Sequence, residues 1–424
     1  MENSAFNFSP ELIRLAKETQ EEIRDSFRSI EEVEEYNGTK VLNAFIKNGI
    51  SEGHLNGSTG YGEGDYGRDA LERVFADAFE CEDALVRNNF SCGTHTLAVG
   101  LFGVLRPGDV LLSVTGIPYD TLQAVVGLSK SEVNEGSLLD WGVKYEQVDL
   151  KDGKIDIETA CKKAKGAKVA YFQRSRGYSL RDSFSVAEIS EAAKAIKAVN
   201  PDIIVMVDNC YGEFTEIREP VSCGADIIIG SLIKNPGGGI ARTGGYIAGR
   251  HDLIHLCACR LNTPGCGRDI GATLNELRNM YLGFFLAPSV VANAVKTAVF
   301  ASRLFEKMGY TVTPKYNETR HDIIQAICLA GPEELCKFCE GIQSGSPVDS
   351  TATPEPWDMP GYPDKVIMAA GAFTNGASIE LSSDAPMRPP YPVFLQGGLT
   401  YPTGKAGVMK AAQKIMDYKA SLGK

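Results

Sequence analysis

The sequence lacks the features that would place the protein in a membrane or on nucleic acid. No run approaches the roughly 18 apolar residues that a membrane span requires. Residues 1–27 alternate apolar and charged side chains at helical spacing, without an apolar segment of the signal-peptide type. Basic residues number 43 against 54 acidic ones, and the net charge of −11 disfavours a general basic surface for nucleic acid or anionic lipid. We therefore expect a cytoplasmic protein with no nucleic-acid or membrane partner.

Motifs that bind metals or nucleotides are also missing from the sequence. The 11 cysteines are scattered, and no further ligands at zinc spacing complete the local pairs Cys257-x-Cys259 and Cys336-x-x-Cys339. No Walker sequence with Gly-Lys-Ser/Thr occurs, and the glycine-rich stretch 57–67 lacks the preceding strand of a dinucleotide fingerprint. We therefore expect no metal.

The sequence does contain alternating strand and helix signals. Its 424 residues suggest two or three domains. Buried strands are expected at 110–114, 143–148, 168–173, 203–207 and 226–229, and a capping box at Ser185-x-x-Glu188 opens a helix between two of them. Such alternation is typical of a mainly parallel sheet covered on both faces.

The order of the expected elements changes after a long helical pattern at 284–308. Strands are expected near 322–329, 365–370 and 378–381, and helices near 333–341 and 405–418. We therefore expect an α/β protein with an N-terminal helical arm at residues 1–55, a large domain at 56–288 and a smaller C-terminal α+β domain at 289–424.

Two of the predicted strands end on residues that can do chemistry. The run beginning at Ile203 ends on Asp208, and the run beginning at Asp226 leads to Lys234 beside a glycine-rich turn. Ligands of open parallel sheets bind at the carboxyl ends of the strands. Burial would lower the pKa of the lysine, and a neutral amine attacks carbonyl groups. The pair suits pyridoxal phosphate (PLP), with Lys234 holding the aldehyde as a Schiff base and Asp208 holding the pyridine nitrogen protonated.

A phosphate group and a planar ring could be held nearby. The segment Ser91-Cys-Gly-Thr-His95 opens a helix and offers small residues, hydroxyls and backbone N–H donors. Ser231 could add a hydroxyl, and Tyr119, on the loop after the strand at 110–114, could supply an aromatic face.

Each of these residues also has a plain structural interpretation. Asp208 could form a turn and Lys234 could be a solvated loop residue. The segment 91–95 could simply cap a helix, and Tyr119 could be one of the exposed tyrosines common in Pro-Tyr turns. Only the combination and its order along the chain favour a cofactor site.

The order of these motifs resembles that of fold-type I PLP enzymes of cysteine and methionine metabolism. The motifs are Tyr61 or Tyr66 with Arg68, Ser91-Cys-Gly-Thr-His95, Tyr119, Asp208 and Ser231-x-x-Lys234. The phrases Gly-Arg-Asp-Ala-Leu-Glu72, Gln173-Arg-Ser-Arg-Gly177, Val207-Asp-Asn-Cys-Tyr-Gly212 and Gln396-Gly-Gly-Leu-Thr-Tyr401 look like the branch of methionine γ-lyase-like or aluminium-resistance proteins. The resemblance covers nearly the whole chain.

The resemblance implies a PLP-dependent transferase-like fold, with a mainly parallel seven-stranded sheet in the large domain. It also implies a role for each motif residue: Lys234, Asp208 and Tyr119 would be catalytic and contact the cofactor, and Gly93, Thr94 and Ser231 would hold its phosphate. Two departures from the family pattern are Cys92-Gly93 in place of a Ser/Gly pair and Ile233 in place of the hydroxyl residue before the lysine.

The resemblance further implies an oligomer and a carboxylate-binding arginine. Tyr61 or Tyr66 with Arg68 would reach the phosphate in a neighbouring subunit, as in a homotetramer built from dimers that share active sites. The substrate carboxylate needs an arginine, for which Arg388 is the first candidate and Arg176 the second.

The expected activity is that of a PLP-dependent carbon–sulfur lyase acting on a sulfur amino acid, of the methionine γ-lyase or cystathionine β-lyase kind. Lys234 would remove the Cα proton, a thiol would leave from Cβ or Cγ, and Tyr119 would assist as an acid or base, ionising more easily beside a cation. One alternative is another PLP reaction on amino acids, namely aldol cleavage or transamination. The other is a non-catalytic protein that binds PLP or a partner.

Overall fold

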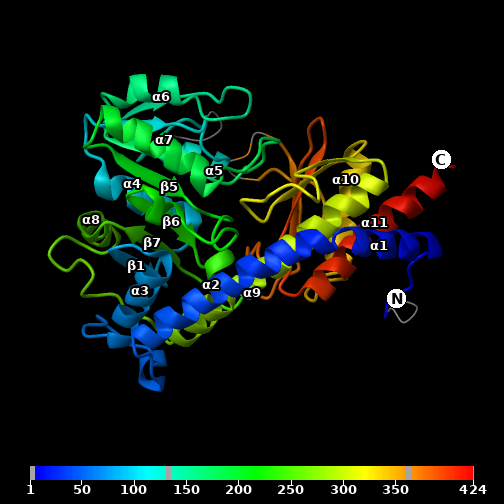
Figure 1. The fold of residues 1–424 in the computed structure, drawn as a ribbon, viewed down its shortest axis with the longest axis horizontal. Helices are drawn as coiled ribbons and strands as arrows, with labels where there is room; N and C mark the ends of the chain where they lie inside the picture. The colour runs from blue at the N-terminus through cyan, green and yellow to red at the C-terminus, as the bar shows by residue number, and fades with distance from the viewer. Residues whose placement is uncertain (1–4, 130–134, 360–361, 363, 424) are drawn as a thin grey trace.

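The chain forms two lobes, each built around its own β-sheet (Figure 1). The computed structural model describes residues 5–129, 135–359, 362 and 364–423. A seven-stranded sheet forms the core of the larger lobe, and a five-stranded sheet that of the smaller. Two long helices, α2 (Arg24–Lys47) and α9 (Leu277–Lys307), run from one lobe to the other.

The large sheet is mainly parallel, as the sequence predicts. Its strands are β1 (Asp83–Arg87), β2 (Val110–Ser113), β3 (Lys144–Gln147), β4 (Val169–Gln173), β5 (Ile204–Asp208), β6 (Ile227–Ser231) and β7 (Gly245–Gly249). They lie in the order β1-β7-β6-β5-β4-β2-β3, and β7 runs in the direction opposite to the other six. The five expected strands are present, whereas β1 and β7 are additions that the sequence did not predict.

Helices cover both faces of this sheet. One face packs against α4 (Gly93–Val104), α5 (Asp120–Val126) and α8 (His251–Leu261). The other packs against α3 (Tyr66–Phe79), α6 (Ile157–Ala164) and α7 (Val186–Val199). The predicted capping box opens α7, because the Glu188 N–H donates to Ser185 Oγ at 3.1 Å and the Ser185 N–H donates to Glu188 Oε2 at 2.9 Å.

The small sheet is antiparallel throughout. Its strands are β8 (Thr311–Thr313), β9 (Gln325–Cys328), β10 (Val366–Ala369), β11 (Ser382–Pro386) and β12 (Pro392–Gln396), in the order β10-β11-β12-β9-β8. Helices α9 and α10 (Pro332–Ser344) pack against its strands, and α11 (Tyr401–Ser421) packs on both of these helices. Strand β12 carries Phe394, which contacts the large lobe through Tyr178 and Tyr211.

The prediction of a strand at 378–381 is wrong. Residues 378–380 form a turn, and β11 begins only at Ser382. The turn is held by the Glu380 carboxylate, which accepts the N–H groups of Phe373 at 2.8 Å and Thr374 at 2.9 Å. Ile379 and Leu381 are buried although they lie outside a strand. Their spacing of two residues therefore suggested a strand that does not form.

Helix α9 is the central element that both lobes share. It begins before the predicted start at Phe284, continues through Pro288 and buries residues along its whole length. Its 31 residues, with a mean hydropathy of 1.5 in the most apolar window, are long and apolar enough for a membrane span, but 72% of that window is buried inside the protein. The expected domain boundary at 288/289 falls inside this continuous helix.

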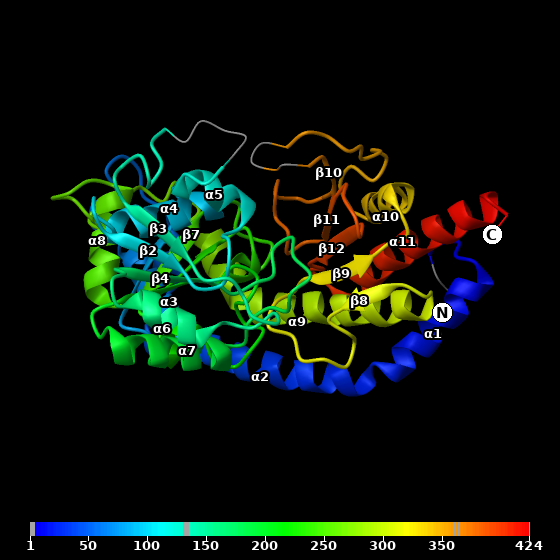
Figure 2. The ribbon, with the colours of Figure 1, turned by 90° about the horizontal axis from the view of Figure 1, so that it is seen from above.

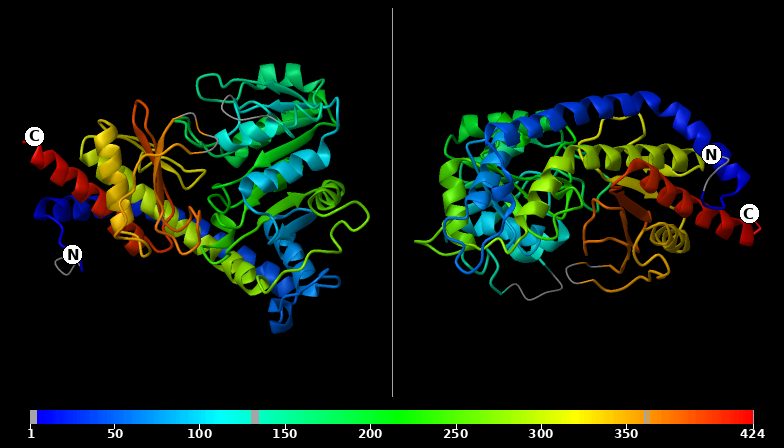
Figure 3. Two further views of the ribbon diagram at one scale, coloured as in Figure 1. Left: turned by 180° about the vertical axis from the view of Figure 1, so that it is seen from behind. Right: turned by 90° about the horizontal axis from the view of Figure 1, so that it is seen from below.

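The N-terminal helices pack along the outside of α9 (Figure 2). Helix α1 (Pro10–Glu22) lies beside α11, so both chain termini lie at the small-lobe end (Figure 3). Leu12, Ala16 and Val41 are fully buried in the main hydrophobic core. These two helices therefore contribute to the core and are more than a peripheral arm. Short 3₁₀ turns complete the chain at Glu52–Leu55, Pro220–Cys223 and Asn235–Gly237.

Candidate active site

Asp208 and Lys234 lie at the same edge of the large sheet. Asp208 is the last residue of β5, and Lys234 follows the end of the neighbouring parallel strand β6. The first turn of α4 meets the same edge. A Cβ atom placed on Gly93 would lie 3.4 Å from Ser231 Cβ and 3.9 Å from Lys234 Nζ. Three separate segments that the sequence singled out therefore converge on one place.

The Lys234 ammonium rests on an aromatic face. Its Nζ lies 4.1 Å from the centroid of the Tyr211 ring, a cation–π contact. Burial alone would lower its pKa. The ionisable groups of Cys210, Tyr211 and Asp208 outweigh burial and raise the pKa above the ordinary value of a lysine. The expectation that burial lowers the pKa of Lys234 is therefore wrong for the protein without a cofactor. That expectation took burial into account but left out these neighbouring groups.

Asp208 is buried and held by two hydrogen bonds. Its Oδ1 accepts the Cys210 N–H at 3.1 Å, and its Oδ2 accepts the Tyr171 hydroxyl at 3.3 Å. Burial raises the pKa of the Asp208 carboxyl, and the nearby Lys234 charge offsets only part of that effect. The carboxyl is thus fixed in orientation and favours a cationic partner.

The end of β6 and the start of α4 fit a phosphate group. Ser231 Oγ is buried without a hydrogen-bond partner among the described residues. The glycine at position 93 leaves the backbone at the N-terminus of α4 open to close approach, and that terminus favours an anion. Thr94 adds a hydroxyl, which lies 2.8 Å from Thr121 Oγ1. An unpaired hydroxyl, a helix N-terminus and an ammonium group are what a phosphorylated aldehyde requires.

Tyr119 contacts other phenols. Its hydroxyl lies 2.6 Å from that of Tyr362, and its ring centroid is 5.7 Å from that of Tyr178. Burial, with further contributions from Tyr362 and Tyr211, raises the pKa of the Tyr119 phenol well above its usual value. The expectation that this phenol ionises more easily beside a cation concerns the cofactor-bound protein and stays a prediction.

Sequence reasoning missed Tyr211, which contacts Lys234, and three residues linked to these two: Asp384, whose charge Lys234 influences, and its neighbours Tyr178 and Gln396. Tyr211 sits in a phrase used for the resemblance but was given no role, and its φ of 72° is unusual for a residue other than glycine. Tyr178 follows Gly177, and Asp384 and Gln396 lie on β11 and β12. The signal for Asp384 was weak, because β11 is a run of small and polar residues without apolar alternation. Gln396 opens a phrase used for the resemblance but was given no role.

Both arginine candidates line one cavity together with Tyr119. The cavity has a volume of about 380 Å³. Arg388 is 42% exposed, and its Nη1 donates to Asp364 Oδ2 at 2.7 Å. Arg176 is buried, and its Nη1 donates to the Thr313 carbonyl oxygen at 3.0 Å. Arg388 is thus the more accessible of the two.

The glycine-rich segment places its two tyrosines on the surface. Tyr61 is 78% exposed and Tyr66 is 56% exposed. Arg68, by contrast, is buried, and its guanidinium donates to the carbonyl oxygens of Gly62 at 2.8 Å and Gly271 at 3.1 Å. Within one chain Arg68 therefore holds this segment in place, and its expected contact with a neighbouring subunit stays a prediction.

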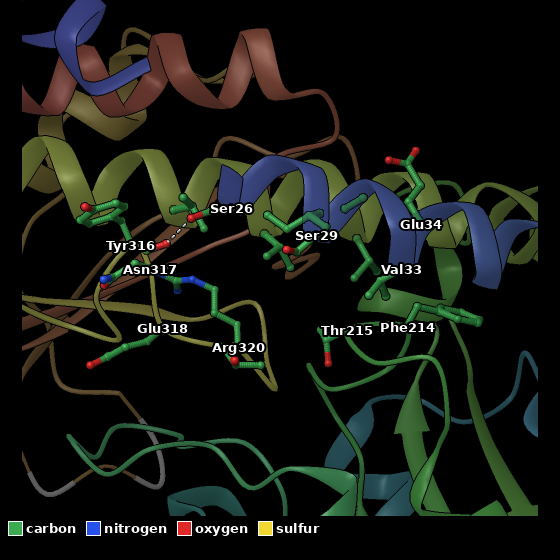
Figure 4. Close-up of a pocket in the computed structure, with 16 residues that line it drawn as sticks. Ser26, Ser29, Val33, Glu34, Phe214, Thr215, Tyr316, Asn317, Glu318 and Arg320 are labelled. Atoms are coloured by element: carbon green, nitrogen blue, oxygen red, sulfur yellow. Dashed lines mark hydrogen bonds between the residues drawn. The ribbon is translucent and has the colours of Figure 1, made fainter. Parts of the chain in front are cut away.

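A second cavity, of about 180 Å³, lies away from these residues, between α2, α9 and the segment 316–320 (Figure 4). Val33 and Phe214 form part of its wall, and Ser26 Oγ closes one side by donating to the Tyr316 carbonyl oxygen at 3.0 Å. In the described part of the chain, no three His, Cys, Asp or Glu side chains gather as metal ligands.

Comparison with known proteins identifies the relatives of the chain. A family model described as methionine gamma-lyase matches residues 12–416. The chain belongs to the methionine gamma-lyase family. Bacillus subtilis YnbB is 49% identical over 407 residues, which make up 96% of each chain.

Solved structures of similar proteins share the fold. A Clostridium acetobutylicum protein, described as a candidate cystathionine beta-lyase involved in aluminium resistance, is 49% identical with a TM-score of 0.93, covering 96% of each chain. A carbon-sulfur lyase involved in aluminium resistance from Clostridium novyi is 47% identical with a TM-score of 0.93, again over 96% of each chain. The PLP-dependent Escherichia coli protein YhfS, 15% identical with a TM-score of 0.61, shares the fold alone over 92% of this chain and 97% of its own. The resemblance to fold-type I enzymes and to the aluminium-resistance branch is confirmed, as is the expected α/β fold.

Proposed function

We propose that the protein is a PLP-dependent carbon–sulfur lyase that acts on a sulfur amino acid. The observation that carries this proposal is the convergence of Lys234, Asp208 and the N-terminus of α4 at one edge of the large sheet. Membership of the methionine gamma-lyase family supports the same reaction class. The unpaired Ser231 hydroxyl beside the ammonium of Lys234 supports the cofactor.

The residues proposed to hold the cofactor come from β5, from the end of β6 and from the start of α4. Lys234 would bind its aldehyde carbon, and Asp208 would accept the N–H of its pyridine ring. Its phosphate would be bound by Ser231 and by the backbone and hydroxyl groups at residues 93–94. When bound, the cofactor supplies an aldehyde that condenses with amines and a ring that withdraws electrons from the substrate Cα.

Protein side chains would orient the substrate and move its protons. Arg388, accessible in the cavity beside Tyr119, would bind the substrate carboxylate, with Arg176 as the second candidate. The amine of Lys234, once neutral, would take the proton from Cα. Tyr119 keeps its phenol proton, because its pKa is raised, and would donate it to the departing sulfur.

We further propose that a neighbouring subunit completes the site. The exposure of Tyr61 and Tyr66 supports a contact with a second copy of the chain. The homotetramer of dimers, the participation of Arg68 and the cytoplasmic location belong to the same proposal.

Product analysis tests the reaction class. With PLP, we expect the protein to release thiol and oxo acid in equal amounts from at least one of cystathionine, cysteine and methionine, because elimination produces both together. Threonine should give no aldehyde. The measurement is a parallel assay of thiol, oxo acid and aldehyde, with protein lacking PLP as the control.

Three outcomes would contradict the proposal. Aldehyde from threonine without thiol from any sulfur amino acid would indicate aldol cleavage, and oxo acid that forms only with an added amino acceptor would indicate transamination. PLP uptake without any product would favour a non-catalytic binding protein.

A further inference from the structure

Three phenols gather where the small lobe meets the large one. The hydroxyl of Tyr119 lies 2.6 Å from that of Tyr362, and Tyr362 is also hydrogen-bonded to Tyr178. The ring centroids of Tyr178 and Tyr362 are 5.4 Å apart, and Tyr178 stacks on Phe394 of β12. Because a phenol can donate one hydrogen bond and accept another, the hydroxyls of Tyr119, Tyr362 and Tyr178 form a continuous hydrogen-bonded row, the phenol chain.

The phenol chain ends on a carboxyl group in the protein interior. Asp384, on β11, is 7% exposed, and Tyr178 donates a hydrogen bond to its carboxyl group. Its Oδ2 also accepts Gln396 Nε2 at 2.8 Å, which fixes the orientation of the carboxyl group. At the other end, Tyr119 lines the cavity that contains Arg388. The phenol chain therefore connects a hydroxyl that a substrate in this cavity can reach with a buried carboxyl group.

The Asp384 carboxyl group can gain or lose a proton near pH 6. Its hydrogen-bond partners are a phenol and an amide, which carry no charge. Burial raises its pKa to about 6, while the hydrogen bonds from Tyr178 and Gln396 and the charge of Lys234 act in the opposite direction. The other titratable groups that face it keep their protons at this pH, since their pKa values are all raised: Lys234, Tyr119, Tyr178, Tyr211, Tyr362 and Cys339. Asp384 is thus the member of this cluster whose charge changes near pH 6.

The proposed reaction moves a proton that needs a temporary acceptor. An amino acid arrives with an ammonium group, which must lose a proton before its nitrogen can attack the cofactor aldehyde. The departing sulfur takes up a proton later, and Tyr119 is the proposed donor. A group that accepts the first proton and returns it for the second step would let a reaction cycle proceed without exchange of this proton with solvent.

We propose that Asp384 stores this proton and exchanges it with Tyr119 along the phenol chain. As the substrate enters, an N–H bond of its ammonium group breaks and the proton passes to the Tyr119 oxygen. Each phenol passes its own proton to the next, and Tyr178 protonates the Asp384 carboxylate. When the C–S bond breaks, Tyr119 protonates the sulfur and every proton moves one step back, so the phenols end neutral and Asp384 ends as a carboxylate. This inference rests on the proposed function and extends it to residues that do not touch the substrate.

The pH dependence of thiol release tests the stored proton. Below about pH 6 Asp384 already carries a proton and cannot accept another, so kcat/KM should fall as the pH decreases through about 6. Asp384→Asn should lower kcat/KM above this pH by about tenfold, less than the roughly 10² to 10⁴-fold effect of a group that acts on the substrate directly. The variant should also lose the fall at acid pH. Asp358→Asn, which changes an exposed aspartate, is the matched control and should keep the wild-type profile.

Tyr362→Phe guards against a local folding defect in Asp384→Asn, because it leaves the carboxyl group in place. It removes the hydroxyl that joins Tyr119 to Tyr178, so it should lower kcat/KM above the pKa of Asp384 and flatten the pH profile in the same way. Tyr36→Phe, which changes an exposed tyrosine, should alter neither the rate nor the profile. A wild-type profile in Tyr362→Phe, or a fall at acid pH that persists in Asp384→Asn, would overturn the proposal.

Infrared spectroscopy of the protein without PLP tests the carboxyl group independently of lyase activity. The carbonyl band of a protonated carboxyl group should appear as the pH falls through about 6. This band should be missing from Asp384→Asn and retained in Tyr362→Phe. Normal thiol release without the band would overturn proton storage alone. A normal band without thiol release from any sulfur amino acid would instead contradict the lyase reaction, and proton storage with it.

Discussion

Lys234→Ala should lose nearly all thiol release, with kcat/KM falling by about 10³-fold or more. The amine is the only group at this edge of the sheet that we assign both to the cofactor aldehyde and to the Cα proton. Positioned proton transfer alone contributes about 10² to 10⁴-fold. The measurement is the rate of thiol and oxo-acid formation from the best sulfur amino acid at saturating PLP.

The control for this prediction is Lys165→Ala, which changes an exposed lysine and should leave the rate unchanged. Borohydride reduction followed by peptide mapping adds a direct test of the covalent link. The label should appear on the peptide that contains Lys234 and be absent from the Lys234→Ala variant. Label on another lysine, or full activity in the variant, would contradict the assignment.

Asp208→Asn should retain the fold and bind PLP but lose most of the activity. Removing one partner of a buried, hydrogen-bonded charge pair costs about 2 to 5 kcal/mol, so kcat/KM should fall by roughly 30-fold to several thousand-fold. Asparagine keeps an oxygen to accept the Cys210 N–H, so the local backbone should stay in place. The measurement is kcat/KM together with the affinity for PLP.

Asp202→Asn provides the comparison, because Asp202 is exposed before the start of β5 and is remote from the carboxyl end of that strand. Its activity should equal that of the unmodified protein. Wild-type activity in Asp208→Asn would show that the carboxylate does not act on the cofactor. Loss of PLP binding with an intact fold would give Asp208 a role in affinity and not in reactivity.

Residues at strand ends could be predicted because their positions follow from local sequence. Asp208 and Lys234 each follow a run of β-branched residues, and parallel strands place their carboxyl ends at one edge. Gly93 and Ser231 were found because a helix start and a strand end have recognisable residue types. Each of these patterns involves only a few residues that are adjacent in the chain, so it can be recognised in the sequence.

The part of Asp384 in the small lobe could not be predicted in this way. Asp384 reaches the site only because β11 pairs with β12 and the small sheet packs against Tyr178, contacts between residues far apart in the chain. The pKa of Lys234 was misjudged for the same reason, since Cys210 and Tyr211 surround its Nζ only in the folded chain. β1 and β7 were overlooked because their pairing across the edge of the sheet leaves little trace in their short sequences.

The continuous course of α9 affects how the candidate active site is assembled. Since the single helix α9 packs into the hydrophobic core of both lobes, neither lobe can complete its core without the other. The spacing between the Lys234 amine in the large lobe and the Asp384 carboxylate in the small lobe is consequently fixed when the chain folds. Substrate therefore binds to a site whose two sides already have their relative positions.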